Sequence, residues 1–247
     1  MRIALLSDLH ANREALSAVL RDAADAAADR YALLGDFVGY GAEPAWTVDR
    51  VRRLAADGAI VVRGNHDEAV VRGSRGSMRA DARHSIDWTR AHLDAGQLAF
   101  LASLPMEHTE GSALYVHANA WEPARWAYIE TRHDAVRSLQ ATACRYTFCG
   151  HMHEPMLYHL SSTGKAGEFR PVPGVAIPLP PHRQWLVIPG AVGQPRDNNP
   201  AACYALFDVE QALLTFRRVP YDHEAAAAKV RAAGLPQDLA DRLLDGT

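Results

Sequence analysis

The chain has 247 residues, 48% of them hydrophobic, so it can bury a substantial core as a single domain, residues 1–247. Its formal net charge of −3 provides no basic surface for nucleic acid, and we expect no sequence-specific nucleic acid partner. No stretch reaches membrane-span length, and the start of the chain becomes charged too soon for a signal peptide. Cys144, Cys149 and Cys203 lack metal-type spacing, which is typical of reduced thiols. We therefore expect a cytoplasmic protein with no membrane partner.

In the first half of the chain, apolar runs alternate with helical patterns. A run with partial helical periodicity predicts a long helical stretch over Ala80–Leu104. The apolar runs predict buried strands at Ile3–Leu6, Tyr31–Leu34 and Ala59–Val62, and the segments after the first two predict helices over Arg13–Ala28 and Ala45–Ala56.

The second half is richer in strands. Ser161–Pro181 contains many glycines and prolines, which predicts a surface excursion built from a hairpin and loop. The tail predicts two short helices within residues 224–244, over Glu224–Ala233 and Gln237–Leu244. Strands are expected near Leu114–Val116, Thr147–Cys149, Met156–Leu160, Trp185–Ile188, Cys203–Asp208 and Leu213–Val219.

Five short segments, far apart in the sequence, contain residue types that bind divalent metal ions. Each segment follows a predicted strand. Ligand sites of α/β sheets form outside the strand ends, so these side chains can converge in space. The segments are Asp8-Leu9-His10, Gly35-Asp36, Gly64-Asn65-His66-Asp67, Val116-His117 and Gly150-His151-Met152-His153.

The segments differ in how strongly they indicate a site. An Asp-x-His triplet arises by chance in a chain of this composition, whereas Gly-Asn-His-Asp and Gly-His-x-His are uncommon. Taken alone, Asp8 and Asp36 could be turn residues or helix caps, and His117 could be structural. A single metal site explains all five segments together, which favours it over separate structural roles.

The candidate ligands are carboxylates, imidazoles and one amide, without a thiolate. This set suits two divalent ions, with Mn expected first and Fe, Zn, Ni or Co as alternatives. Two ions about 3.5–4 Å apart need a bridging ligand, and Asp36 is the candidate because a carboxylate has two oxygens. Two divalent ions carry four positive charges, and Asp8 and Asp36 neutralise only two of them. The remaining positive charge can hold a hydroxide and attract a phosphate. We therefore expect a hydrolase in which a metal-bound hydroxide attacks a phosphate ester.

Motif by motif, these segments resemble the calcineurin-like metallophosphoesterase superfamily. Its D-x-H, G-D, G-N-H-[DE], H and G-H-x-H signature is matched from Asp8 to His153. Pro189-Gly190-Ala191-Val192-Gly193-Gln194 resembles a turn of the small bacterial phosphodiesterase branch. The resemblance implies an α/β fold in which two mixed β-sheets pack face to face with helices outside both.

The resemblance also implies a role for each site residue. His66 would contact the phosphate and can protonate the leaving oxygen, and Asp67 would orient His66 by hydrogen bonding. One metal ion would be bound by Asp8, His10, Asp36 and His153, and the other by Asp36, Asn65, His117 and His151.

The second motif bears on the substrate. Ser/Thr protein phosphatases of this superfamily have an arginine where this chain has Tyr40. A bidentate arginine is the natural partner of a dianionic phosphate, so its absence favours a phosphodiester or a small nucleotide as the phosphorylated substrate. A phosphomonoesterase or a dinucleoside-polyphosphate hydrolase is the alternative, in which Arg63 or Arg196 replaces the missing arginine.

A metal-binding protein-interaction scaffold is the alternative from another functional class, since the retromer subunit shares the fold. Such scaffolds tend to lose metal ligands or the histidine of the third motif. His66 and every candidate ligand are present here, which favours an enzyme.

Several other residues keep two interpretations. Asn12 is expected to cap the helix at Arg13 but could touch substrate. Arg196 and Asp197 could reach a substrate or pair with each other. Four tryptophans are expected to pack in the core or a lid rather than stack on a base, and these are Trp88, Trp121, Trp126 and Trp185.

Overall fold

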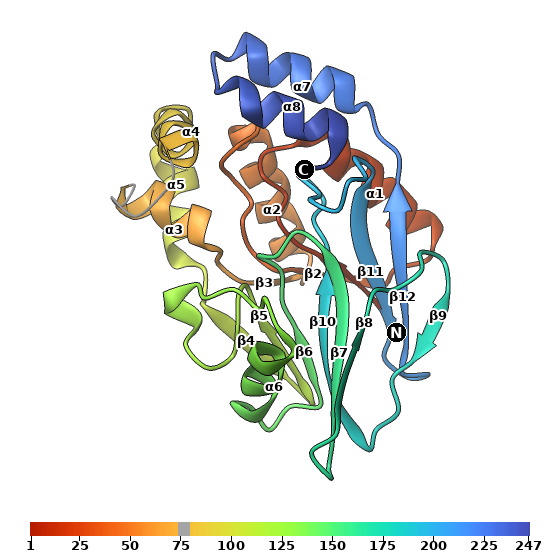
Figure 1. The fold of residues 1–247 in the computed structure, drawn as a ribbon. Coiled ribbons are helices and arrows are strands. Elements are labelled where there is room, and N and C mark those ends of the chain that lie inside the picture. Colours follow the sequence, from red (N-terminus) through yellow and green to blue (C-terminus); the bar gives the residue numbers. More distant parts are fainter. Residues whose placement is uncertain (74–79) are drawn as a thin grey trace.

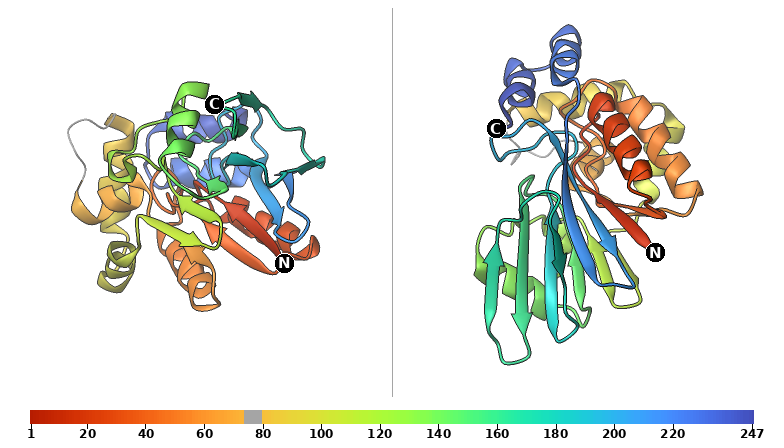
Figure 2. Two further views of the ribbon diagram at one scale, coloured as in Figure 1. Left: turned by 90° about the horizontal axis from the view of Figure 1, so that it is seen from below. Right: turned by 90° about the vertical axis from the view of Figure 1, so that its right-hand side faces the viewer.

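Two six-stranded mixed β-sheets form the centre of the protein (Figure 1). The computed structural model describes residues 1–73 and 80–247. The strand order is β3-β2-β1-β11-β12-β9 in the first sheet and β4-β5-β6-β10-β7-β8 in the second. The sheets pack face to face with helices on their outer surfaces, so the predicted α/β sandwich is confirmed (Figure 2).

Each sheet contains three neighbouring parallel strands. In the first sheet these are β1 (Arg2–Leu6), β2 (Arg30–Leu33) and β3 (Ile60–Val61). In the second they are β5 (Ala113–Val116), β6 (Tyr146–Phe148) and β10 (Arg183–Pro189). The antiparallel strands are β4 (Glu107–Glu110), β7 (Pro155–Ser161), β8 (Ala166–Phe169), β9 (Ala176–Pro178), β11 (Ala202–Asp208) and β12 (Leu213–Val219).

The first strand is apolar throughout because both of its faces are buried. Ile3 and Leu5 face the second sheet, where they join the core between the sheets. Ala4 and Leu6 face the helices on the outer side of the first sheet. Burial on both faces is why this strand is a continuous apolar run instead of an alternating pattern.

Helices surround the two sheets, and the last two lie together at one end of the molecule (Figure 1). The short turn η1 (Pro123–Arg125) precedes α6. The helices are α1 (Arg13–Asp25), α2 (Pro44–Ala56), α3 (Asn65–Arg72), α4 (Ala80–Ala91), α5 (Ala95–Ser103), α6 (Arg132–Gln140), α7 (His223–Ala232) and α8 (Gln237–Asp245).

Two predicted helices end earlier than expected. The helix predicted over Arg13–Ala28 ends at Asp25, because Ala27 adopts a left-handed backbone conformation with φ of 55°. The stretch predicted over Ala80–Leu104 is divided into α4 and α5. Asp94 begins α5 as its N-cap, accepting from the amide of Gln97, whose side chain in turn accepts from the Asp94 amide.

Three elements were not predicted, namely α3, β4 and α6. Helix α3 begins at Asn65, inside the third motif, where the sequence predicted candidate site residues but no helix. The predicted excursion Ser161–Pro181 forms β8, which pairs with β7, and β9, which pairs with β12. The two tail helices are confirmed with small shifts at their ends.

The tail helices pack on the main body. Residues of α7 and α8 form an apolar cluster that Tyr40, Ala42 and Trp88 join from the first half of the chain. That the whole chain forms one domain remains a prediction. Within the described residues, no helix combines the length and apolar character needed to cross a membrane.

A charged network ties α1 to the first sheet. The Asp22 carboxylate accepts two hydrogen bonds from Arg217, each of 2.7 Å, and one of 2.6 Å from the Tyr204 hydroxyl. The hydrogen bonds from Arg217 lower the pKa of Asp22, against the effect of its partial burial. The ionised carboxylate therefore stabilises the contact between α1 and strands β11 and β12.

We expect Asp22→Asn to lower the free energy of unfolding at neutral pH by about 1–3 kcal/mol, since it weakens hydrogen bonds to a charged group. The folded-state pKa of Asp22 is below its unfolded value, so this contribution is present above the unfolded pKa. It is lost as the pH falls through the folded pKa. Urea unfolding at neutral and acidic pH measures the difference, with the exposed Asp57→Asn as control. Equal stability of Asp22→Asn and the unaltered protein at neutral pH would contradict the assignment.

Candidate metal centre

The predicted ligands emerge from the carboxyl ends of the parallel strands of both sheets. Asp8, Asp36 and Asn65 follow β1, β2 and β3, while His117 and His151 follow β5 and β6. Because the two sheets pack face to face, these strand ends bring the side chains to one place.

The loops that carry the ligands have unusual backbone conformations. Asp8, His10, Asp36, His151 and His153 all have positive φ, between 44° and 68°. Such conformations are costly for residues other than glycine and are concentrated at functional sites. The tertiary structure here holds five predicted ligand residues in strained positions.

Glycines allow these loops to approach closely. A Cβ atom at Gly64 would collide with Asp36, and one at Gly150 would collide with Ser7. The main chain then joins the motifs, because the Asp36 carboxylate accepts from the His66 amide at 2.8 Å and the Asp8 carboxylate accepts from the His151 amide at 3.0 Å. The glycines of the motifs are therefore required by the close packing of one motif against another.

The side chains form two buried clusters. Donor atoms of Asp8, His10 and His153 lie within 4.8 Å of one another, as do those of Asp36, His117 and His151. Each cluster can hold a metal ion.

The two clusters meet at Asp36, and Asn65 lies beside the second cluster. The Asp36 Oδ2 atom lies 3.4 Å from His117 Nε2 in its own cluster and 3.8 Å from His10 Nε2 in the other. Asn65 Oδ1 lies 3.1 Å from His117 Nε2 and so joins the second cluster. This is the arrangement predicted for a bridging aspartate, although the role of each residue as a ligand remains a prediction.

Hydrogen bonds fix the orientation of the four histidines. In each ring one nitrogen lies within hydrogen-bonding distance of a backbone carbonyl, so that nitrogen must carry the proton. The pairs are His10 Nδ1 with Val38 O at 3.2 Å, His117 Nδ1 with Leu34 O at 2.7 Å, His151 Nε2 with Trp126 O at 3.0 Å, and His153 Nδ1 with Gln194 O at 2.6 Å.

In a neutral ring, the other nitrogen then presents a lone pair. The Nε2 atoms of His10 and His153 face each other at 3.1 Å, and the buried Asp8 Oδ1 has no hydrogen-bond partner among the described residues. Lone pairs and a carboxylate oxygen directed at one point repel unless a cation lies between them. Metal-bound histidines in proteins typically donate their other N–H to a carbonyl in this way. The donor set therefore fits a divalent cation.

The pKa shifts agree with this interpretation. Burial lowers the pKa of His10 well below its usual value and that of His151 to about 3, so both rings are neutral and able to bind a metal. Burial also acts on His117, but the nearby Asp36 carboxylate outweighs it and raises the pKa of His117 to about 9. The second cluster thus attracts positive charge, which a divalent ion supplies more strongly than a proton.

Comparison with known proteins identifies the family. The profile of the calcineurin-like phosphoesterase superfamily domain matches residues 1–212. The chain belongs to this superfamily. It is similar to the crystal structure of a metallophosphoesterase from Sphaerobacter thermophilus, with a TM-score of 0.88 and 37% identity over 100% of both chains.

Two curated relatives extend the comparison. A protein of Methanocaldococcus jannaschii is 34% identical over 250 residues, which is 99% of this chain and 98% of its own. The symmetrical bis(5'-nucleosyl)-tetraphosphatase of Aromatoleum aromaticum is 36% identical over 110 residues, covering 41% of this chain and 39% of its own. Membership of the superfamily makes the chain a phosphoesterase, and the two clusters suit the divalent metals that this superfamily uses.

One predicted role in this metallophosphoesterase is wrong. Asp67 does not orient His66, since no hydrogen bond joins the two side chains in the described structure. The Asp67 carboxylate instead accepts from the amides of Phe37 and Gly64, both at 2.9 Å. Adjacent residues of a helix do not face each other, so Asp67 points to the second-motif loop while His66 points to the site.

Packing positions His66. Its ring lies 4.5 Å from the ring of Tyr40, and a Cβ atom at Gly39 would collide with it. Its Nδ1 atom is buried without a hydrogen-bond partner within the described ranges, and burial lowers its pKa to about 4. This imidazole differs from the four candidate ligands because no carbonyl fixes its proton.

A wall of the site was missed by sequence analysis. The Tyr128 ring stacks on the His151 ring at 4.1 Å, and the carbonyl of Trp126 accepts from His151. Trp126 Nε1 also donates to Glu68 at 3.0 Å. These residues lie in a loop without hydrophobic periodicity, so only the fold reveals them. The packing interpretation is confirmed for the buried Trp185 but does not suffice for Trp126.

A cavity of about 540 Å³ opens beside His66 and the second cluster. This volume is within the range of small-molecule sites. Among the residues that line it are Tyr40, Asn65, His66, Trp126, Tyr128 and His151.

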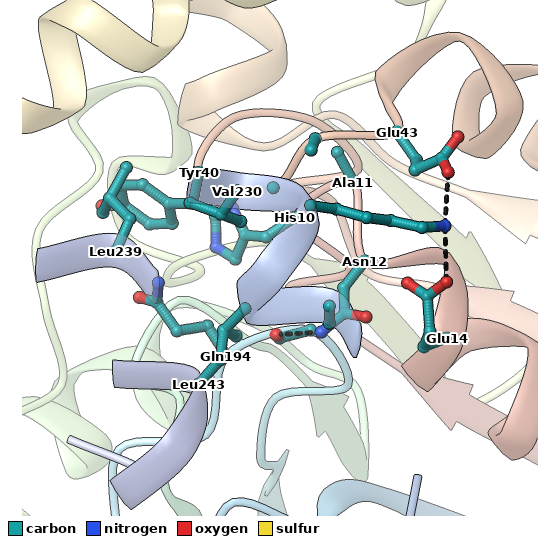
Figure 3. Close-up of a pocket in the computed structure, with 15 residues that line it drawn as sticks. His10, Ala11, Asn12, Glu14, Tyr40, Glu43, Gln194, Val230, Leu239 and Leu243 are labelled. Atoms are coloured by element: carbon teal, nitrogen blue, oxygen red, sulfur yellow. Dashed lines mark hydrogen bonds and ion pairs between the residues drawn. The ribbon is translucent and has the colours of Figure 1, made fainter. Parts of the chain in front are cut away.

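On the other side of the site, α7 and α8 close the space. Figure 3 shows Leu239, Leu243 and Val230 of these helices beside His10 and Tyr40. The cavity between them is about 10 Å³, room for about one water molecule. This region is a packed seam, and a substrate must enter from the open cavity.

Two open alternatives are now resolved. Asn12 caps α1, accepting from the Ala15 amide at 3.1 Å, and its amide donates to Gly193 O at 2.8 Å, so the predicted cap is confirmed. Asp197 pairs with Arg218 and not with Arg196.

We expect Asp36→Asn to weaken Mn²⁺ binding at least about tenfold more than Asn65→Ala. Asp36 faces both clusters and neutralises charge, whereas Asn65 offers one neutral oxygen to one cluster. Titration calorimetry of both variants measures the difference, with Asp57→Asn as control. Equal losses in the two variants would count against a bridging Asp36.

Proposed function

We propose that this protein hydrolyses a phosphodiester or a small nucleotide with two divalent metal ions. The observation that carries the proposal is the pair of buried clusters joined at Asp36, whose donor atoms face one another. Mn²⁺ is the expected ion, with Fe, Zn, Ni or Co as alternatives. One ion would be held by Asp8, His10, Asp36 and His153, and the other by Asp36, Asn65, His117 and His151.

When bound, the two ions lower the pKa of water and so supply the nucleophile, and they neutralise charge on the phosphate. The protein contributes position and exclusion of water. Backbone carbonyls hold the histidines in one orientation, and α7 and α8 close the site on one side. His66 lines the cavity, and we infer that it contacts the phosphate and protonates the leaving oxygen.

We expect His66→Ala to keep both metal ions and lower kcat by about 10²–10⁴-fold, the usual range for losing an acid–base group. The loss should be smaller for p-nitrophenyl esters, because p-nitrophenolate needs little protonation. Measuring kcat against the pKa of the leaving group tests this, with His84→Ala, exposed on α4, as the matched control. A loss independent of the leaving group would assign His66 to phosphate binding alone.

The open cavity favours a substrate with an organic group beyond the phosphate. Trp126 and Tyr128 provide aromatic surfaces close to the second cluster, and such surfaces accept a nucleobase. A dinucleoside-polyphosphate hydrolase is the second candidate, and the local similarity to the Aromatoleum aromaticum tetraphosphatase supports it.

A scaffold without activity is disfavoured by the completeness of the site. All the candidate ligands converge, and His66 lies beside them. Strained ligand loops of this kind are retained when a site is used, since they destabilise the fold.

Removal and return of metal tests the proposal. We expect the chelated protein to be inactive and Mn²⁺ to restore hydrolysis of at least one of bis-p-nitrophenyl phosphate, p-nitrophenyl phosphate and diadenosine tetraphosphate. The Asp36→Asn variant, treated in the same way, is the control, because it receives the same Mn²⁺ but lacks the predicted bridging carboxylate. Protein that binds two ions yet hydrolyses none of the three esters would favour the scaffold alternative.

A further inference from the structure

Arg196 lies at the rim of the first cluster, on a segment bound to one of its ligands. Its amide donates to the carbonyl of His153 at 3.3 Å, and its Nη2 donates to Gln194 Oε1 at 3.2 Å. The carbonyl of Gln194 accepts from His153 Nδ1 at 2.6 Å. The position of Arg196 is therefore coupled to the first cluster through hydrogen bonds to His153 and Gln194.

The Arg196 guanidinium lies over the ring of Tyr40, one of the residues that line the cavity. It lies 5.8 Å from the centre of the Tyr40 ring. Burial raises the pKa of Tyr40 and Tyr128, and the charge and hydrogen bonding of Arg196 oppose that rise in both. The same positive charge also acts on His66. Arg196 is not itself among the residues that line the cavity, but Tyr40, Tyr128 and His66 are, so the guanidinium lies next to the cavity wall at Tyr40.

Other basic side chains around the site are neutralised by carboxylates. Arg72 pairs with Glu68 at 2.7 Å, Arg125 pairs with Glu122 at 3.3 Å, and Lys229 pairs with Glu14 and Glu43, each at 2.6 Å.

Arg196 is different, because it pairs with no carboxylate in residues 1–73 and 80–247. Asp197, its neighbour in the chain, forms an ion pair with Arg218. The Nε atom of Arg196, like that of Arg63, is buried and has no hydrogen-bond partner among the described residues. A buried donor on an uncompensated cation calls for an anionic acceptor.

We propose that Arg196 binds the second negative charge of a dianionic phosphate at the reacting position. It would then fill the role of the arginine that Tyr40 displaces from the second motif. This inference rests on the proposed function and narrows its substrate class to doubly charged phosphate ends, such as a nucleotide with two or more phosphates.

The charge balance supports this narrower class. Two divalent ions with Asp8 and Asp36 leave two positive charges, which a singly charged diester and an anionic nucleophile already balance. A second charge on the substrate needs a third cation, and a planar guanidinium suits phosphate oxygens. Neither Arg196 nor Arg63, the other sequence-based candidate, is among the residues that line the cavity, but the Arg196 guanidinium lies 5.8 Å from the centre of the Tyr40 ring, which does line it.

The test compares two esters with the same leaving group in the Mn²⁺-loaded protein at mildly alkaline pH. We expect Arg196→Ala to lower kcat/KM for the dianion p-nitrophenyl phosphate by about 10–100-fold. For the monoanion bis-p-nitrophenyl phosphate, kcat/KM should change less than about threefold. Inorganic phosphate should bind about tenfold more weakly by calorimetry, with the metal content unchanged. For Arg196→Lys, both kcat/KM for p-nitrophenyl phosphate and the affinity for phosphate should lie between those of the unaltered protein and Arg196→Ala. Lysine keeps the charge but not the planar arrangement of donors.

The exposed Arg53→Ala is the matched control. Thermal unfolding of Arg196→Ala and Arg196→Lys shows whether each variant is folded. If Arg196→Ala does not fold, the kinetics of Arg196→Lys alone decide the test. Equal effects on both esters, or an unchanged affinity for phosphate, would overturn the inference. Absence of metal-dependent hydrolysis in the unaltered protein is a distinct result, because it would overturn the proposed function instead.

Discussion

The structure depends on one constraint, which is that buried electron-pair donors must be held facing one another. Asp8 Oδ1 lies 3.3 Å from His153 Nε2, and that nitrogen lies 3.1 Å from His10 Nε2. Without positive charge between them such groups repel, and burying them costs free energy. The surrounding fold must therefore oppose this repulsion, and two divalent ions would remove it.

Backbone contacts supply much of that opposition. The amides of Val192 and Gly193 donate to the carbonyls of Ser7 and Asp8 at 2.9 and 2.8 Å, which holds the turn after β10 against the first motif. Asp67, which does not touch His66 through a hydrogen bond, closes the second motif against the third. The site is thus a set of loops joined by hydrogen bonds, and the position of each candidate ligand is fixed by the neighbouring loops.

The sequence predicted a site residue only where that residue lies in a motif that follows a predicted strand. The ligands were found because uncommon motifs follow apolar runs, and parallel strands bring their carboxyl ends together. Tyr128 was not found, and Trp126 was expected only to pack in the core or a lid, because the loop before α6 has no periodicity and its position is set by packing on His151. The role of Asp67 was misassigned because α3, which separates the directions of neighbouring side chains, was not predicted. The break between α4 and α5 was missed because the cap at Asp94 lies within an otherwise helical pattern.

The most direct test of this account is a crystal structure of the protein grown with Mn²⁺, with anomalous scattering used to locate the ions. The account predicts two ions about 3.5–4 Å apart, with one Asp36 oxygen on each. The Nε2 atoms of His10, His117 and His153, and the Nδ1 atom of His151, should point at them. A single ion, or two ions without Asp36 between them, would contradict the central claim.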